Sequence, residues 1–336
     1  MDHRHHSRRR WLQQAAAGGV ALGLGPRAFA QADWPRSPIR LVVPYAAGGV
    51  TDILARLLAK EVSTSLGQTV IIENRAGAGG TVGVAVVAKA PPDGYTVGIA
   101  GSSALIATPM LTPQVPFSVP GDFSFVSLCA TVPMALTVAS SMPVNNAQEL
   151  LAYMRANAGK LSYGSTAVGH YGHVATMEMS ESQKAGMVHS PYKGETPLMQ
   201  DLLGGQIQVA FLAPSTAKPM VDAGKLKLLA VSGTKRLKPL PDLPTLVEQG
   251  LDAPVFRMNP GWLGILAPAK LPPEVAQRLS AAFAAAVRAP EVNDRILQMG
   301  LDPVGSTGEQ FLGTYQSERP VWRELLTKAG LEIKGN

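Results

Sequence analysis

The chain has 336 residues, of which 46% are hydrophobic and 16% charged, with 34 glycines, 27 prolines and one cysteine. This composition excludes an intrinsically disordered chain, which would be poor in apolar residues, and a coiled coil, because glycine and proline interrupt nearly every stretch. One cysteine excludes an internal disulfide framework and a CxxC pair. The length favours two domains with a large core.

The net charge of +6 is concentrated at the N-terminus. The first thirty residues hold five arginines and one aspartate, which leaves a net charge of +2 for the rest of the chain. No long run of lysine and arginine occurs in that remainder. Nucleic acid is therefore not an expected partner.

Residues 1–30 are predicted to be an export signal. A basic segment precedes the apolar stretch Ala15–Leu24, which is too short to span a membrane, and Ala28-Phe29-Ala30 fits a cleavage site before Gln31. Ser7–Leu12 resembles the twin-arginine pattern, and an ordinary Sec signal fits equally well. Either route predicts a mature protein that is soluble in the periplasm.

Strand and helix patterns alternate along the first part of the body. The predicted strands are Ile39–Tyr45, Thr69–Glu73 and Thr96–Ala100, and the predicted helices begin at Thr51-Asp52 and at Thr81, ending at Gly67 and Ala90. This alternation predicts a parallel sheet with helices on its faces.

The same alternation restarts after residue 133. Predicted strands are Met134–Ala139, Leu161–Gly164, Met187–His189, Ile207–Leu212, Lys227–Val231 and Gly264–Leu266, and predicted helices are Ala147–Asn157, a helix from Gly169 to about Ser182, Thr196–Leu203, Pro273–Val287, Pro290–Met299 and Gly308–Ala329. Two α/β lobes therefore fit better than one. No flexible linker separates them, so we expect the chain to cross between lobes near Thr131–Ala135 and Asp252–Trp262.

A glycine-rich turn before the first helix is a candidate anion site. In Gly48-Gly49-Val50-Thr51-Asp52, backbone N–H groups at the start of a helix can converge on a carboxylate or phosphate, and the helix dipole adds positive potential. The structural alternative is a tight turn in which Asp52 caps the helix. The spacing alone leaves both interpretations open.

A second turn of the same kind lies in Tyr163–His173. Ser165 and Thr166 offer hydroxyl groups, and the amides near Gly169 and His170 could hold a second anion. His170 and His173 have a spacing that a metal accepts, but a metal needs a third ligand, so a helix histidine bonded to backbone is the favoured reading of His173.

The remaining candidates are isolated residues. Lys193 could pair with a ligand carboxylate or simply face solvent, and Cys129 lies in an apolar run typical of a buried thiol. Neither a GxSxG nucleophile motif, a phosphate loop, a complete GxGxxG nor an HExxH motif occurs. No acidic pair stands out as a general acid and base.

Several segments in order closely resemble the Bug family, the extracytoplasmic solute-binding receptors of tripartite tricarboxylate transporters found in Bordetella and its relatives. The resemblance spans essentially the whole mature chain. It rests on Trp34–Asp52, Glu73–Gly80, Pro92–Thr96, Tyr163–His173, Pro191–Gly194, Asp201–Gly205, Leu240–Thr245 and Trp262–Gly264.

This resemblance implies a two-lobed periplasmic binding protein of type II topology, with 34–133 plus 256–336 as one lobe and 134–255 as the other. It implies a monomer without cofactor, metal or catalysis that closes over a small carboxylate and delivers it to a two-subunit membrane permease. The ligand-binding residues expected are Tyr45, Ala47, Gly48, Gly49, Thr51, Asp52, Ser102, Ser103, Ser165, Thr166, Gly169, His170, His173 and Lys193.

The second turn departs from the family pattern. Ala167 stands where a glycine is usual, His170 replaces a small serine, and Gln208 replaces an aspartate. A bulky, titratable His170 could shrink or recharge the pocket. Two alternatives stay open: an exported hydrolase of a small acid with His170 or His173 as base, and a receptor that feeds a two-component sensor.

Overall fold

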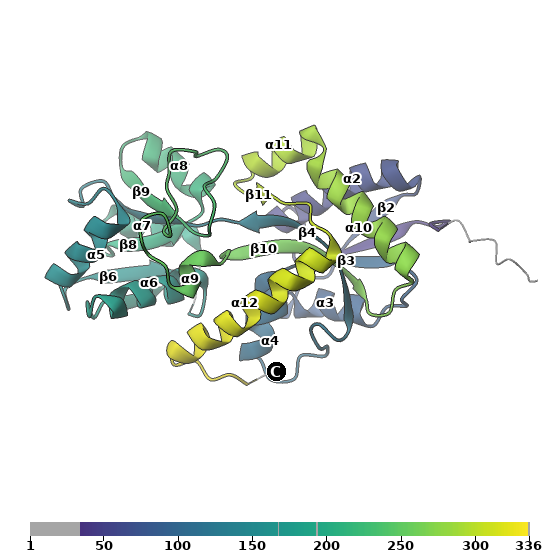
Figure 1. Ribbon diagram of the computed structural model, residues 1–336, viewed down its shortest axis with the longest axis horizontal. Helices are drawn as coiled ribbons and strands as arrows, with labels where there is room; N and C mark the ends of the chain where they lie inside the picture. Colours follow the sequence, from purple (N-terminus) through teal and green to yellow (C-terminus); the bar gives the residue numbers. More distant parts are fainter. Residues whose placement is uncertain (1–33, 167, 193, 335–336) are drawn as a thin grey trace, which may run out of the picture.

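The computed structural model describes residues 34–166, 168–192 and 194–334, which form two mixed α/β lobes side by side (Figure 1). The predicted export signal (1–30), Ala167 and Lys193 lie outside the described residues.

The first lobe is built on a six-stranded sheet. Its strand order is β11-β4-β10-β3-β1-β2. The strands are β1 (Ile39–Val43), β2 (Val70–Asn74), β3 (Thr96–Gly101), β4 (Phe123–Val132), β10 (Gly261–Pro268) and β11 (Asp302–Pro303). β1 pairs in parallel with β2 and β3, whereas β10 is antiparallel to both of its neighbours.

Helices pack around this sheet. They are α2 (Val50–Leu66), α3 (Thr81–Ala88), α4 (Thr108–Leu111), α10 (Pro273–Arg288), α11 (Pro290–Gln298) and α12 (Gly308–Lys328), with a 3₁₀ turn at Ala78–Gly80 and a π-helical turn at Ser103–Ala107. In Figure 1, α12 runs from the first lobe along the edge of the molecule toward the second.

The second lobe is built on a five-stranded sheet in the order β7-β6-β8-β5-β9. Its strands are β5 (Ala135–Ala139), β6 (Ser162–Ser165), β7 (Val188–Pro191), β8 (Val209–Leu212) and β9 (Leu226–Val231). Its helices are α5 (Ala147–Ala156), α6 (Tyr171–Ser182), α7 (Glu195–Leu203), α8 (Pro214–Asp222) and α9 (Pro254–Arg257).

The prediction of parallel sheets is wrong for the strands next to the crossings. β5 is antiparallel to β8 and β9, as β10 is to β3 and β4. The reason is the path of the chain: it leaves the first sheet at the end of β4, enters the second through β5 after two intervening residues, and returns through β10. A strand that the chain enters from the other lobe is antiparallel to the strands of the local β-α-β units.

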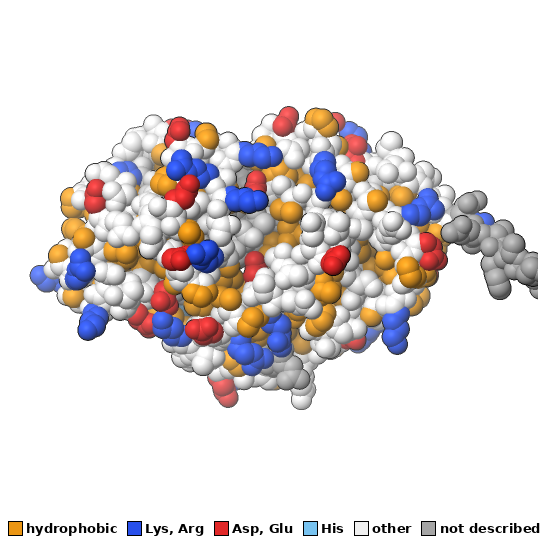
Figure 2. All heavy atoms as spheres, in the orientation of Figure 1, with side chains coloured by type: hydrophobic (Ala, Val, Ile, Leu, Met, Phe, Trp, Pro, Cys, Tyr) orange, Lys and Arg blue, Asp and Glu red, His pale blue; other side chains and the backbone are white. Residues whose placement is uncertain are grey.

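The interior is apolar and the surface charge is mixed. A large cluster of buried side chains reaches both sheets, from Val42 on β1 to Phe211 on β8 and Trp262 on β10. Figure 2 shows Lys and Arg side chains scattered among Asp and Glu on the face drawn. Within the described ranges, we find no helix with the length and apolar character needed to cross a bilayer.

Candidate functional site

The glycine-rich turn between β1 and α2 is held open toward solvent. Gly48 has a φ of +83°, a backbone conformation that favours glycine, and Gly49 is the N-cap of α2, with no side-chain cap hydrogen bond. The prediction that Thr51-Asp52 begins the helix is therefore corrected: Val50 is the first helical residue. The first amide groups of α2 are left without a side-chain acceptor.

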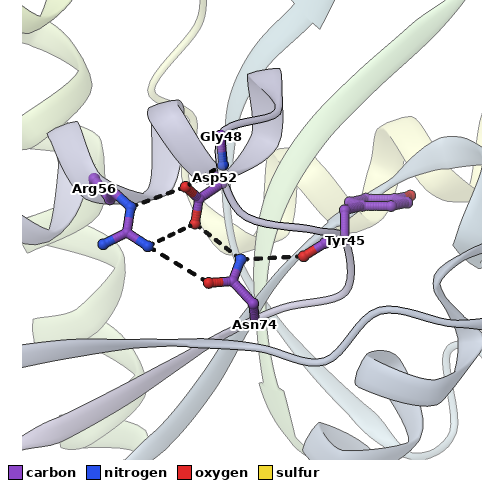
Figure 3. A network of polar contacts seen from close by, with 5 residues as sticks. All are labelled: Tyr45, Gly48, Asp52, Arg56 and Asn74. Carbon is purple, nitrogen blue, oxygen red and sulfur yellow. Dashed lines mark hydrogen bonds and ion pairs between the residues drawn. The ribbon is translucent and has the colours of Figure 1, made fainter.

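Asp52 stabilises this turn through hydrogen bonds to Gly48, Arg56 and Asn74 (Figure 3). Its carboxylate accepts hydrogen bonds from the Gly48 amide, from Arg56 Nε and from Asn74 Nδ2, each at 2.9 Å. Asn74 Nδ2 also donates to the Tyr45 carbonyl at 3.1 Å. Asp52 is 2% exposed, and the Arg56 guanidinium lowers its pKa to about 2, so it is ionised at neutral pH.

The second turn, between β6 and α6, repeats this arrangement in the other lobe. Gly169 has a φ of +81°, and His170 is the N-cap of α6 without a side-chain cap. The His170 ring lies 3.1 Å from Thr166 Oγ1 through Nδ1. The His170 side chain is exposed and lines the cavity between the lobes, and partial desolvation there lowers its pKa.

The other two histidines are structural supports of the second turn. The Gly169 amide donates to His173 Nδ1 at 3.0 Å, so the ring proton of neutral His173 is on Nε2. The His173 ring stacks on His189 at 4.0 Å, and His189 Nε2 lies 2.8 Å from Ser165 Oγ. Burial lowers the pKa of His173, and burial with the neighbouring His173 lowers that of His189 to about 4. His173 is thus the backbone-bonded helix histidine that we expected.

A cavity of about 250 Å³ lies between the two turns and is lined from both lobes. Eight of the predicted site residues line it: Tyr45, Thr51, Ser102, Ser103, Ser165, Thr166, Gly169 and His170. Ala47, Gly48, Gly49, Asp52 and His173 do not line it in this state, and Lys193 lies outside the described residues. Asp52 and His173 instead hold the two turns from behind.

The walls of the cavity are apolar and aromatic, and sequence reasoning missed them. They include Met134, Tyr171, Phe211, Trp262 and Trp322. Among the described residues that line the cavity there is no Asp, Glu, Lys or Arg. Trp262 lay in a segment that carried the family resemblance, but nothing in the helical spacing of α12 distinguishes Trp322 from a core residue.

Trp262 is anchored by a buried acid. Its Nε1 donates to Glu318 Oε2 on α12 at 2.8 Å. Glu318 is 6% exposed, and burial raises its pKa to about 7. Glu318 therefore ties α12 to the strand by which the chain returns to the first lobe.

Within the described ranges, no cluster of His, Cys, Asp and Glu side chains has the arrangement of a metal site. His170 and His173 have the right spacing, but His173 Nδ1 already accepts from backbone. Cys129 is buried in the first lobe, and burial raises its pKa to about 12.

Two α/β lobes, crossed twice by the chain and enclosing a cavity between two helix N-termini, define a two-lobed solute-binding protein of type II topology. Residues 54–331 match the tripartite tricarboxylate transporter family receptor. The chain belongs to this family, which is a family of solute-binding receptors, and the predicted resemblance to Bug proteins is confirmed.

The similarity to known proteins extends over nearly the whole chain. BugT of Bordetella pertussis is 32% identical over 90% of this chain and 92% of its own. The periplasmic binding protein BugD is 34% identical with a TM-score of 0.67, covering 89% of this chain and 99% of that one.

Two solved structures of similar proteins contain an acid. Rpa4515 of R. palustris, solved with adipate, is 31% identical with a TM-score of 0.71 over 89% of this chain and 99% of that one. MatC of Rhodopseudomonas palustris, solved with malate, is 28% identical with a TM-score of 0.65 over 87% and 100%.

Proposed function

We propose that this receptor is exported to the periplasm, where it captures a small carboxylate between its lobes and delivers it, without catalysis, to a membrane permease of two subunits. The lobes comprise 34–133 plus 256–336 and 134–255. The protein acts as a monomer and needs no cofactor.

One observation supports the proposed ligand class: two helix N-termini, one from each lobe, face a single cavity whose described lining contains no Asp, Glu, Lys or Arg. Thr51 in the first turn of α2 and Tyr171 and Gly172 in the first turn of α6 line that cavity. Neither helix has a side-chain cap, so backbone N–H groups are available to an anion. Together with the dipoles, such groups favour a carboxylate without any basic side chain.

The other proposed ligand contacts are hydroxyl groups and one imidazole. Ser102 and Ser103 follow β3, while Ser165 ends β6 and Thr166 follows it, so the ends of strands in both sheets supply oxygens to the cavity. His170 adds a ring that can donate to a ligand oxygen. Lys193 stays a proposed ligand contact on the family resemblance alone.

The test is a thermal-shift screen of the mature chain, residues 31–336, against monocarboxylates, dicarboxylates, tricarboxylates and aromatic acids. A ligand at 100 times its dissociation constant stabilises the folded state by about 2.7 kcal/mol, which gives a clear rise in melting temperature. If no acid raises it, the proposed ligand class is wrong. If an acid is consumed on incubation with the protein, the hydrolase alternative replaces the receptor.

Closure is tested separately by small-angle scattering. Because the lobes are joined by strands rather than by a tether, a ligand that bridges them should reduce the radius of gyration. An unchanged radius at saturation would refute a clamshell mechanism. Uptake of the same labelled acid by cells that lack the receptor, with and without its gene restored, separates transport from sensing.

A further inference from the structure

A second cavity lies between the lobes, apart from the proposed ligand site. Its volume is about 340 Å³, and its lining is mostly apolar. The second lobe lines it with α8, with β9 and with the loop that follows β9. The first lobe lines it with residues from the end of α11 to the start of β11. Among the described residues, none lines both this cavity and the ligand cavity.

The two cavities lie on opposite sides of the crossing between β4 and β5. Val132 and Met134 line the ligand cavity, whereas Pro133 between them lines the second cavity. In an extended chain, successive side chains point to opposite faces. Figure 1 agrees: α8 and α11 lie along one edge of the molecule, and α12 lies along the other, with β10 between them. The second cavity is therefore on the hinge side of the molecule, and we call it the hinge-side cavity.

The hinge-side cavity and the ligand cleft are mechanically coupled. Two lobes that rotate as rigid bodies about the crossings move in opposite senses on the two sides. Closing the ligand cleft widens the hinge-side cavity, and opening the cleft narrows it. A contact between the lobes at the hinge-side cavity therefore limits how far the ligand cleft can open.

Ser215 and Gly300 make such a contact. Ser215 lies in the first turn of α8 in the second lobe, and Gly300 follows α11 in the first lobe. A Cβ added to Gly300 would lie 2.5 Å from the Ser215 Cβ and closer still to its Oγ, so there is no room for a methyl group between the lobes here. Gly300 also has a φ of +76°, which favours glycine after a helix. Because the lobes already touch at this point, the cleft cannot open further unless one of these residues moves.

Charges across the same cavity act in the same direction. Asp302 of β11 lines the cavity from the first lobe, and Lys235 and Lys238 lie in the loop after β9 of the second lobe. Burial raises the pKa of Asp302, and the two lysines oppose that rise because they attract its carboxylate across the gap. This attraction favours a narrow hinge-side cavity and hence an open cleft.

We propose that the contact of Ser215 with Gly300 is a stop that sets the open position of the lobes, and that these two residues thereby determine ligand affinity without touching the ligand. A substitution that disfavours the open position enlarges the fraction of molecules that are closed and competent to hold a ligand. The apparent dissociation constant falls in proportion. The link to affinity rests on the proposed function, whereas the stop itself does not.

The test introduces one methyl group at the stop. In Gly300→Ala the new Cβ collides with Ser215, so the lobes should move apart on the hinge side even without a ligand. Spin labels at Lys225→Cys and Asp294→Cys, two exposed positions that do not line the hinge-side cavity, measure the distance across it by double electron–electron resonance. Cys129 is buried and should take up no label. The label distances should shift to longer values in Gly300→Ala.

Two controls separate the collision from the strain of an alanine with a positive φ. Ser215→Gly removes the colliding atoms and leaves the Cα of residue 215 at 3.6 Å from the new methyl group, an ordinary contact. In that background, Gly300→Ala should change neither the label distances nor the affinity. Gly224→Ala, just after α8, has a φ of +68° and nothing within 4 Å of the added Cβ. It should lose comparable stability without changing distance or affinity.

Calorimetric titration with adipate, malate and benzoate measures the effect on binding. Gly300→Ala should bind each of these acids that wild type binds about five- to tenfold more tightly. The factor should be the same for each acid, because the substitution acts on the position of the lobes and not on a ligand contact.

The outcomes separate this inference from the proposed function. Equal label distances in Gly300→Ala and wild type would show that the collision is absorbed locally, and the stop would be refuted whatever the acids do. Longer distances with unchanged or weaker binding would refute the role of the stop in affinity. If wild type binds no acid at all, the proposed function fails, and the label distances still decide whether the stop exists.

Discussion

Replacing Asp52 by asparagine should reduce both stability and ligand affinity, although Asp52 does not line the cavity. The side chain keeps its shape in this variant, but it loses the charge that Arg56 contacts and one of the oxygens that accept from Gly48 and Asn74. The first turn is the part of the site that these bonds fasten (Figure 3).

The magnitude follows from the pKa of Asp52. A decrease from 3.8 to about 2 corresponds to about 2 kcal/mol of stabilisation by the charged form. This is an upper figure, because Arg56 is half exposed and solvent screens the pair. Since the pKa is lowered in the folded state, wild type has this stabilisation in full above about pH 4 and loses it as the pH falls toward 2. Asp52→Asn should lack that acid-dependent loss.

Denaturant unfolding at pH 7 and at pH 3, with calorimetric titration of any ligand found by the screen, measures both effects. If a disordered first turn must be reordered on binding, the same free energy weakens every ligand by about ten- to thirtyfold. Asp222→Asn is the matched control: Asp222 pairs with Lys218 at the same helical spacing but is 59% exposed, so neither stability nor affinity should change appreciably. Wild-type affinity in a destabilised Asp52→Asn protein would refute the idea that this network organises the ligand seat.

Three further outcomes are expected. Affinity for a carboxylate should rise as the pH falls from 7.5 to 5.5, because the bound anion raises the lowered pKa of His170 and binding takes up a proton. His170→Ser should abolish this pH dependence in calorimetric titrations. A flat wild-type profile would show that the imidazole does not contact the ligand. Glu318→Gln should be more stable than wild type at pH 8 and equal to it at pH 4 in urea unfolding. The reason is that the pKa of Glu318 is raised to about 7, so wild type loses stability as the pH rises through 7. Identical unfolding curves for wild type and variant at both pH values would contradict a buried charge on Glu318. Cys129 should not react with a thiol reagent at pH 8 until the protein is unfolded, since burial raises its pKa to about 12, and rapid labelling of the native protein would contradict this burial.

The local patterns predicted most helices and strands because their signals are short-range. Asn146 caps α5 through the Glu149 amide, as a capping residue before a helical pattern should. α8 is not predicted by its apolar pattern, because Pro219 lies within it and proline normally argues against a helix. β4 could not be distinguished from β5 in the sequence, because one continuous apolar run covers both strands. The two are separate strands because β4 pairs in the first sheet and β5 pairs in the second.

The two turns of the site were also predictable, since glycines before a helix start are a local feature. The roles within them were less so. Asp52 was weighed as a cap or a ligand contact. It does not cap the helix: it accepts from the amide before the N-cap, from Arg56 one turn later, and from Asn74 at the end of the neighbouring strand. The contact with Asn74 depends on the pairing of β1 with β2, which the sequence of the turn does not contain.

The apolar part of the cavity depends on contacts between elements far apart in the chain, and this determines which ligand it selects. Under the proposed function the two turns bind the carboxylate groups of the ligand. Turns of this kind would accept many acids equally, because backbone N–H groups recognise a carboxylate and not the rest of the molecule. Discrimination must come from the walls, and the walls are set by where α12 lies. Glu318 fixes Trp262 and Lys328 joins α12 to α6, so the helix that carries Trp322 is held against both lobes. We therefore expect that a substitution on α12 can change ligand choice while both turns remain intact.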